Sequence, residues 1–171
     1  MRENSNLGQS SLKMTNKKVL ILGLGNEILS DDGIGPRIVR ELSEKYQRSN
    51  IRYEIVCCGG LDIVELIRDY EKVILVDAIK TSGGIPGDVY FFKPSEFKET
   101  LHLSGLHDIN FITALRLSEN LDQKLPVDLH IIAIEIIEDM EFSEELTMPL
   151  KEAYPSILEN VSSSIKKILA E

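Results

Sequence analysis

Cysteine is scarce in this sequence: the chain of 171 residues has two, Cys57 and Cys58, and they are neighbours. Adjacent cysteines are poorly placed to connect distant segments, so we expect a fold that needs no disulfides. A chain of this length can bury roughly 70% of the surface that it exposes when unfolded, which is enough for a stable core without them. The sparse cysteine usage also suits a reducing compartment and predicts a cytoplasmic protein.

Basic residues are outnumbered by acidic ones. The chain has 19 Lys and Arg against 28 Asp and Glu, which gives a formal net charge of −9. Binding to the phosphate backbone of a nucleic acid or to an anionic membrane surface requires clustered basic side chains. No apolar run approaches the ~20 residues of a membrane-spanning helix either. We therefore expect neither a nucleic-acid partner nor membrane association.

The first 16 residues are polar and differ in composition from the rest of the chain. They lack the apolar stretch of about 7–15 residues that a secretory signal needs. We expect residues 1–16 to form a mobile N-terminal extension, and Met14 is an equally good candidate for the natural start. Residues 17–171 have the length of a single domain.

After residue 17, short apolar runs alternate with helical patterns. Strands are predicted at residues 19–24, 51–56, 73–76, 89–92 and 129–137. Helices are predicted from Pro36 onward and at residues 61–67, 109–117, 144–154 and 156–169, the last two separated by Pro155. Strands that alternate with helices are typical of a parallel sheet covered on both faces. The pattern predicts an α/β fold, a three-layer αβα arrangement with a mostly parallel central sheet of about five strands.

The segment GLGNEILSDDGIGP (residues 23–36) follows the first predicted strand. In an open α/β sheet, ligands bind beyond the carboxyl ends of the strands, so this segment is a candidate for function. Its opening is similar to the dinucleotide fingerprint GxGxxG. However, Ile28 stands where the third glycine belongs, and Gly33 and Gly35 lie too far along to restore the fingerprint. A dinucleotide-binding domain is therefore a weak alternative.

Two aspartates in this segment, Asp31 and Asp32, place negative charges where the pyrophosphate of a dinucleotide would lie. The loop therefore favours a cation. Either aspartate can instead cap the helix that begins near Pro36, because Asp is a preferred N-cap residue and complements the helix dipole. Both interpretations stay open from the sequence.

Two further candidates lie later in the chain: Asp77 follows the third apolar run, and His107 precedes a predicted helix. Each has an ordinary alternative, because Asp77 can bond a loop N–H at a strand end and His107 can be a cap or a solvated side chain. Together with Asp32, they form a set of two carboxylates and one imidazole, which suits a divalent first-row metal with open coordination positions. His130 interrupts the last strand and is interpreted as a sheet residue, and His102 is a weaker candidate.

Five segments carry a resemblance to a known family. They are, in order, LGLGNEILSDDGIGP (22–36), GG (59–60), ILVDAI (74–79), PG (86–87) and SGLHD (104–108). On these motifs the sequence resembles the maturation endopeptidases of [NiFe]-hydrogenases, which trim a C-terminal peptide from the hydrogenase large subunit. The likeness extends over about residues 18–169, and its first segment is long and distinctive. The resemblance implies the phosphorylase/hydrolase-like αβα fold of that family.

The resemblance also implies a metal site formed by an acid in the first loop, an aspartate after a strand and a histidine before a helix. These positions correspond to Asp32, Asp77 and His107, which we expect to act both as metal ligands and as catalytic residues. It further implies a monomer without a permanent cofactor. The metal would be the nickel already inserted in the precursor of the large subunit, with zinc or cadmium able to substitute in vitro. Relatives often have an aspartate, implicated in client recognition, where this chain has Cys58.

The sequence offers no Ser–His–Asp or Cys–His nucleophile, so peptide hydrolysis would use an activated water. The client's nickel either activates the scissile carbonyl or the water, or only positions the cleavage site while a carboxylate acts as general base. The aspartic-type classification of the family favours the second route. Two alternatives are a non-catalytic nickel-dependent chaperone or inspection module, and a peptidyl-tRNA hydrolase-like enzyme. The latter begins with a similar GLGN segment but needs a basic surface that this acidic chain lacks.

Overall fold

The structure, a computed structural model, describes residues 18–57, 60–94, 96 and 106–171, without the side chains of residues 106–110 and 112. The predicted extension, residues 1–16, lies outside the described residues. The elements are, in order, β1 (Val19–Leu24), the 3₁₀ helix η1 (Ser30–Gly33), α1 (Ile34–Lys45), β2 (Ile51–Val56), α2 (Gly60–Ile67), β3 (Lys72–Ile79), β4 (Val89–Phe92), α3 (Leu106–Asn120), β5 (Asp128–Glu135) and α4 (Met148–Ala170). Among the described residues, each helix is too short or too polar to span a bilayer.

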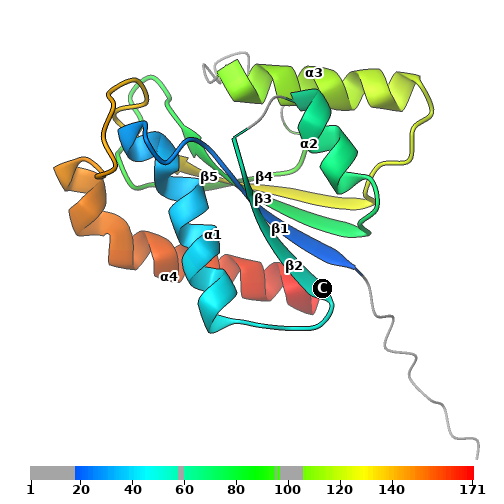
Figure 1. Cartoon of the computed structure of the whole chain (residues 1–171), viewed down its shortest axis with the longest axis horizontal. Helices are drawn as coiled ribbons and strands as arrows, with labels where there is room; N and C mark the ends of the chain where they lie inside the picture. Colours follow the sequence, from blue (N-terminus) through cyan, green and yellow to red (C-terminus); the bar gives the residue numbers. More distant parts are fainter. Residues whose placement is uncertain (1–17, 58–59, 95, 97–105) are drawn as a thin grey trace, which may run out of the picture.

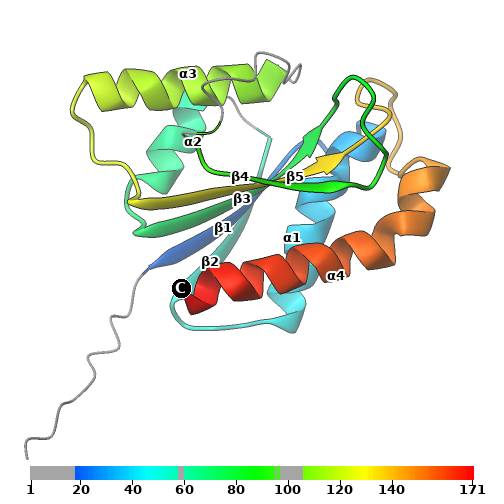
Figure 2. The ribbon, with the colours of Figure 1, turned by 180° about the vertical axis from the view of Figure 1, so that it is seen from behind.

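The five strands form one sheet in the order β2-β1-β3-β5-β4. Every neighbouring pair is parallel except β4 and β5, which are antiparallel. Helices α1 and α4 cover one face of the sheet, and α2 and α3 cover the other (Figures 1 and 2). The predicted three-layer αβα fold with a mostly parallel sheet of five strands is therefore confirmed.

Side chains of β3 alternate between the two cores. Ile74, Val76 and Ala78 belong to the core under α1 and α4, whereas Val73 and Leu75 belong to the core under α2 and α3. Successive side chains of a strand point to opposite faces, so the same alternation places Asp77 on the face that α2 and α3 cover. β3 is buried along its whole length, as expected for a central strand of a parallel sheet.

Helix α4 differs from the prediction, because it continues through Pro155 and does not break there. A proline inside a helix lacks one N–H donor and costs about 3 kcal/mol. Buried side chains on both sides of Pro155, including Leu150, Ile157 and Val161, pack on one core, and this packing keeps the helix in one piece. The prediction also began this helix too early, since residues 137–147 form a loop between β5 and α4.

In the sheet, β2 lies on one side of β1 and β3 lies on the other side of β1. In an open α/β sheet, such a switch point forms a crevice at the carboxyl ends of the two strands. Gly35 lets α1 approach this point closely. A Cβ atom at Gly35 would lie 2.4 Å from the carbonyl oxygen of Val76 in β3 and 2.6 Å from that of Leu24 in β1. Gly35 therefore allows close packing of α1 on β1 and β3, because any larger residue would clash with these two carbonyl oxygens.

Candidate functional site

The candidate site lies at the switch point between β1 and β3. Asp32 belongs to η1, which follows β1, and Asp77 belongs to β3. β1 and β3 are parallel neighbours, with Gly23 paired to Val76, so Asp77 follows directly on the last pair of their ladder. The structure therefore brings both predicted carboxylates to one edge of the sheet, although they are 45 positions apart in the sequence.

Asp32 is half-buried, and its Oδ2 accepts a hydrogen bond of 2.6 Å from the backbone N–H of Asn26. The loop wraps tightly around it. Gly25 has a φ of 134°, and a Cβ atom at that position would lie 2.0 Å from the carbonyl oxygen of Asp32. Gly33 is the N-cap of α1, and no side chain caps that helix. The alternative that Asp31 or Asp32 caps α1 is therefore wrong, because η1 places both of them before the cap position.

Asp77 is buried, with 7% of its surface exposed, and its Oδ1 accepts a hydrogen bond of 2.8 Å from the N–H of Ala78. The prediction ended the strand at Val76, whereas β3 continues to Ile79, so Asp77 lies within the strand. Its neighbour on β5 is Ala133. Asp77 therefore lies at the edge of the sheet where ligands of open α/β folds bind, which keeps it a candidate for function.

His107 lies in the first turn of α3, whereas the prediction placed it on a loop before the helix. Its side chain lies outside the described part of the structure, as does all of His102 and Cys58. α3 covers the face of the sheet to which Asp77 belongs, and its last turn leads to the start of β5 (Figure 1). Its first turn therefore points toward the carboxyl edge of the parallel strands.

Among the side chains that the structure describes, no three His, Cys, Asp or Glu residues are grouped so that they could hold a metal ion. The imidazole of His107 is not among these side chains. The metal site of Asp32, Asp77 and His107 therefore stays a prediction, with its two carboxylates at one edge.

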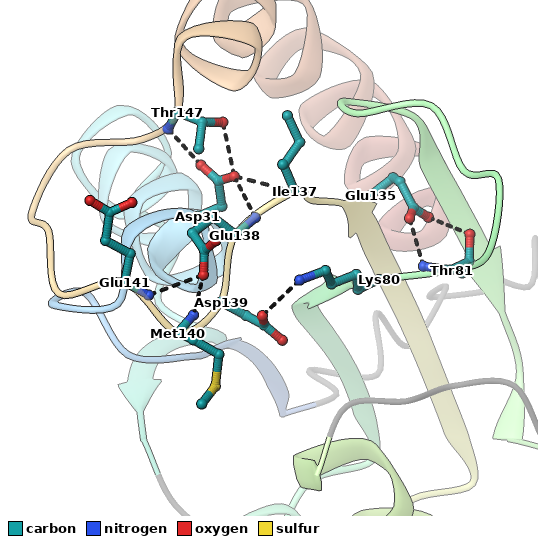
Figure 3. A network of polar contacts seen from close by, with 10 residues as sticks. All are labelled: Asp31, Lys80, Thr81, Glu135, Ile137, Glu138, Asp139, Met140, Glu141 and Thr147. Carbon is teal, nitrogen blue, oxygen red and sulfur yellow. Dashed lines mark hydrogen bonds and ion pairs between the residues drawn. The ribbon is translucent and has the colours of Figure 1, made fainter.

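Asp31 has a different environment from Asp32, and its role was missed from the sequence. It is fully buried, and its carboxylate accepts four hydrogen bonds (Figure 3). The donors are the N–H of Ile137 at 3.3 Å, the N–H of Glu138 at 3.1 Å, and the N–H and hydroxyl of Thr147 at 2.7 and 2.9 Å. Asp31 therefore fastens η1 to both ends of the loop between β5 and α4. No local pattern reveals this, because the donors lie more than 100 positions away.

Glu135 is a buried carboxylate that the sequence did not single out. Only 2% of its surface is exposed, and it accepts hydrogen bonds from the N–H of Thr81 at 2.6 Å and from the hydroxyl of Thr81 at 2.8 Å (Figure 3). Burial raises the pKa of the neighbouring Tyr90 hydroxyl, and the charge of Glu135 raises it further. The one available signal was an acidic residue inside the apolar run 129–137. Glu135 fastens the turn after β3 to the end of β5.

His130 lies in β5 and is a sheet residue, as predicted. Its Nε2 is 2.6 Å from Oδ1 of Asp128, whose Oδ2 is 3.1 Å from Nζ of the buried Lys72. Burial raises the pKa of the Asp128 carboxyl, but hydrogen bonding to Lys72 and the nearby His130 outweigh burial and hold that pKa below its ordinary value. Lys72 and Asp128 begin their strands, so this cluster lies at the edge opposite the candidate site.

Comparisons with known proteins show the family of this chain. The family model described as hydrogenase maturation protease matches residues 36–164. The hydrogenase 2 maturation protease of Escherichia coli (strain K12) is 32% identical over 117 residues, which cover 63% of this chain and 69% of that protein.

Solved structures of similar proteins have the same fold. The hydrogenase maturating endopeptidase HybD from Escherichia coli superposes with a TM-score of 0.69 at 24% identity, covering 88% of this chain and 93% of that one. The [NiFe] hydrogenase maturation protease HybD from Thermococcus kodakarensis superposes with a TM-score of 0.64 at 28% identity, covering 85% of this chain and 97% of that one. Family model, relatives and fold agree, and this chain belongs to the hydrogenase maturation protease family, a family of peptidases.

Proposed function

We propose that this chain is the endopeptidase that removes a C-terminal peptide from the nickel-loaded precursor of a [NiFe]-hydrogenase large subunit. Membership of the maturation protease family supports the reaction class. The observation that carries the proposal is the placement of Asp32 and Asp77 at the switch point between β1 and β3. Ligands of open α/β sheets bind at such a point.

In this proposal the nickel belongs to the precursor and enters the site with it. Asp32, Asp77 and His107 provide two carboxylates and one imidazole, a set that accepts a divalent first-row metal and leaves coordination positions for the precursor's own ligands. The protease needs no resident cofactor, and zinc or cadmium would occupy the same ligands in vitro. The ligands come from η1, β3 and α3, so the site depends on the fold for its assembly.

Hydrolysis joins the oxygen of a water to the scissile carbonyl carbon and breaks the amide C–N bond, and the leaving amine takes a proton. We favour an aspartic-type route in which a carboxylate of the site accepts the proton of the attacking water as general base. The nickel then serves mainly to hold the cleavage site beside that carboxylate.

Dependence on the client's nickel also explains selectivity. A three-ligand site gains most of its affinity from the ion, so a precursor without nickel binds weakly and stays uncut. Cleavage thereby follows metal insertion. We further propose that the protease acts as a monomer in the cytoplasm, in keeping with its two adjacent cysteines.

The test is to incubate the purified chain with nickel-loaded precursor and to measure the mass of the large subunit. The proposal predicts a loss of mass equal to one C-terminal peptide, and no loss when the precursor lacks nickel. A stable complex of unchanged mass would contradict the peptidase and point to a non-catalytic inspection module. Equal cleavage of precursors with and without nickel would contradict the recognition step.

A further inference from the structure

Three large apolar side chains are exposed within a short stretch of the chain between β5 and α4. This β5–α4 loop (residues 137–147) and the residue after it expose Met140 to 76%, Phe142 to 81% and Met148 to 64%. Exposed apolar residues scattered singly are common on protein surfaces, so three within nine residues at 64% exposure or more are a concentration that suits an interaction site. Burial of these apolar side chains against another molecule would favour binding.

The backbone of the β5–α4 loop is held in place by hydrogen bonds. Asp31 binds the N–H groups at both ends of the loop (Figure 3). In the middle of the loop, the carbonyl oxygen of Ser143 accepts a hydrogen bond of 2.8 Å from the N–H of Ser30. The N–H of Ser143 donates a hydrogen bond of 3.0 Å to the carbonyl oxygen of Ile28. The loop is therefore ordered before any partner arrives, and a preordered surface loses less entropy on binding.

The loop also has a strong negative charge. Residues 137–148 include five acidic side chains and no Lys or Arg. Two of the acids form ion pairs with residues outside the loop, Asp139 with Lys80 and Glu145 with Lys151. Glu138 accepts hydrogen bonds from the N–H groups of Met140 and Glu141, and these bonds lower the pKa of its carboxyl, so it stays ionised. A partner segment with both apolar and basic side chains complements this surface.

The β5–α4 loop begins beside the candidate site. Asp31, which holds both ends of the loop, is the neighbour of Asp32. Ile136, just before the loop, donates its N–H to the carbonyl oxygen of Ile79 at 2.8 Å, two residues beyond Asp77. A segment that lies on this loop is therefore at the edge of the sheet where cleavage is proposed.

We propose that the β5–α4 loop is a docking surface for a segment of the precursor that has both apolar and basic side chains. This inference rests on the proposed function, because it takes the precursor as the partner. Docking holds the precursor through contacts that do not involve the nickel, and Met140 and Phe142 provide the apolar part of those contacts. The acidic side chains of the loop select a basic segment and repel an acidic one.

The test compares two double variants of the full chain. In the first, Met140→Ser is combined with Phe142→Ser on the loop. In the matched control, Leu121→Ser is combined with Val127→Ser, two residues exposed to 61% and 96% between α3 and β5, at the opposite edge. Affinity for nickel-loaded precursor is measured by titration calorimetry, and cleavage at saturating precursor is measured by mass. Sedimentation velocity measures the oligomeric state of each chain.

We expect the loop variant to bind precursor at least 10-fold more weakly, the control to bind within twofold of the original chain, and both to cleave normally at saturation. Glu141→Lys should weaken binding about threefold and reduce its dependence on salt. Equal affinity of the loop variant and the control would overturn the proposal. A self-association that only the loop variant abolishes, with its precursor affinity unchanged, would overturn it in favour of a second copy. Since affinity is read separately from cleavage, a chain that binds but never cuts would refute the peptidase and leave the docking surface standing.

Discussion

Two neighbouring aspartates of the first loop have opposite environments. Asp31 is fully buried, and both of its carboxylate oxygens accept hydrogen bonds from groups on the loop between β5 and α4. Asp32 is half-buried at the edge of the sheet, next to the strand that contains Asp77. Residue type and sequence position do not separate the two. Burial and the partners of each carboxylate separate them: Asp31 is fully buried and bonds the distant loop between β5 and α4, whereas Asp32 is half-buried and bonds Asn26 within its own loop.

The largest effect is expected from the candidate site itself. Asp32→Asn, Asp77→Asn and His107→Ala should each reduce processing of nickel-loaded precursor by roughly 100-fold or more, because each removes a proposed ligand or general base. The mass of the large subunit after incubation measures this loss. The circular dichroism spectrum of each variant should stay that of the original chain.

A matched control lies at the opposite edge of the sheet. Asp128→Asn changes a carboxylate that binds Lys72 and His130 far from the switch point, and it should leave processing within twofold of normal. Normal processing by all three site variants would reject the assignment of the site.

A stability measurement tests whether Asp31 and Asp32 differ in their structural roles. Asp31→Ala leaves the N–H groups of Ile137, Glu138 and Thr147 without their acceptor and should lower the free energy of unfolding by about 3 kcal/mol. Asp32→Ala removes the acceptor of the Asn26 N–H in a half-buried position and should cost about 1 kcal/mol. Urea unfolding measures both. Equal losses would mean that Asp31 has no special structural role.

A third test addresses the approach of α1 to the strands. Gly35→Ala introduces a Cβ atom 2.4 Å from the carbonyl oxygen of Val76, so helix and strand must move apart. Such overpacking costs about 1–3 kcal/mol and would shift η1, and Asp32 with it. We expect a lower melting temperature together with slower processing. A variant with normal stability and activity would show that the close packing is dispensable.

The smallest effect concerns pH. The folded pKa of Asp128 lies below its unfolded value, so its contribution to stability is present above a pH of about 4 and is lost as the pH falls through the folded pKa. Because its side chain is one-third exposed, solvent screening keeps this contribution below about 1 kcal/mol. The free energy of unfolding of Asp128→Asn should therefore fall less steeply below a pH of about 4 than that of the original chain, as acid unfolding measures. Identical acid profiles would show that the pair with Lys72 does not contribute.

Much of the fold follows from local patterns. The predicted strands at 19–24, 51–56 and 89–92 agree with β1, β2 and β4. The first is a continuous apolar run that contains one glycine, and the second alternates apolar with polar residues. Pro155 misled the prediction, because tertiary packing on both sides of it overrides the local preference against proline. Helix α4 shows that a breaker residue has to be weighed against the core that its helix covers.

The site is less predictable than the fold. Asp32 and Asp77 could be selected because the carboxyl ends of parallel strands meet at one edge. The structural roles of Asp31 and Glu135 could not be predicted, because their hydrogen-bond partners come from distant loops whose positions no local pattern contains. A buried carboxylate is defined by its donors, and those become visible only in three dimensions.

The central claim is that Asp32, Asp77 and His107 form one cation site, and X-ray absorption at the nickel edge tests it most directly. The purified chain is loaded with Ni²⁺, and the ligands of the bound ion are compared with those in His107→Ala and Asp77→Asn. The account predicts one ion per chain, coordinated by one imidazole nitrogen and carboxylate oxygens, with the imidazole lost in His107→Ala and the affinity reduced in Asp77→Asn. A spectrum and an affinity that neither variant changes would contradict the claim.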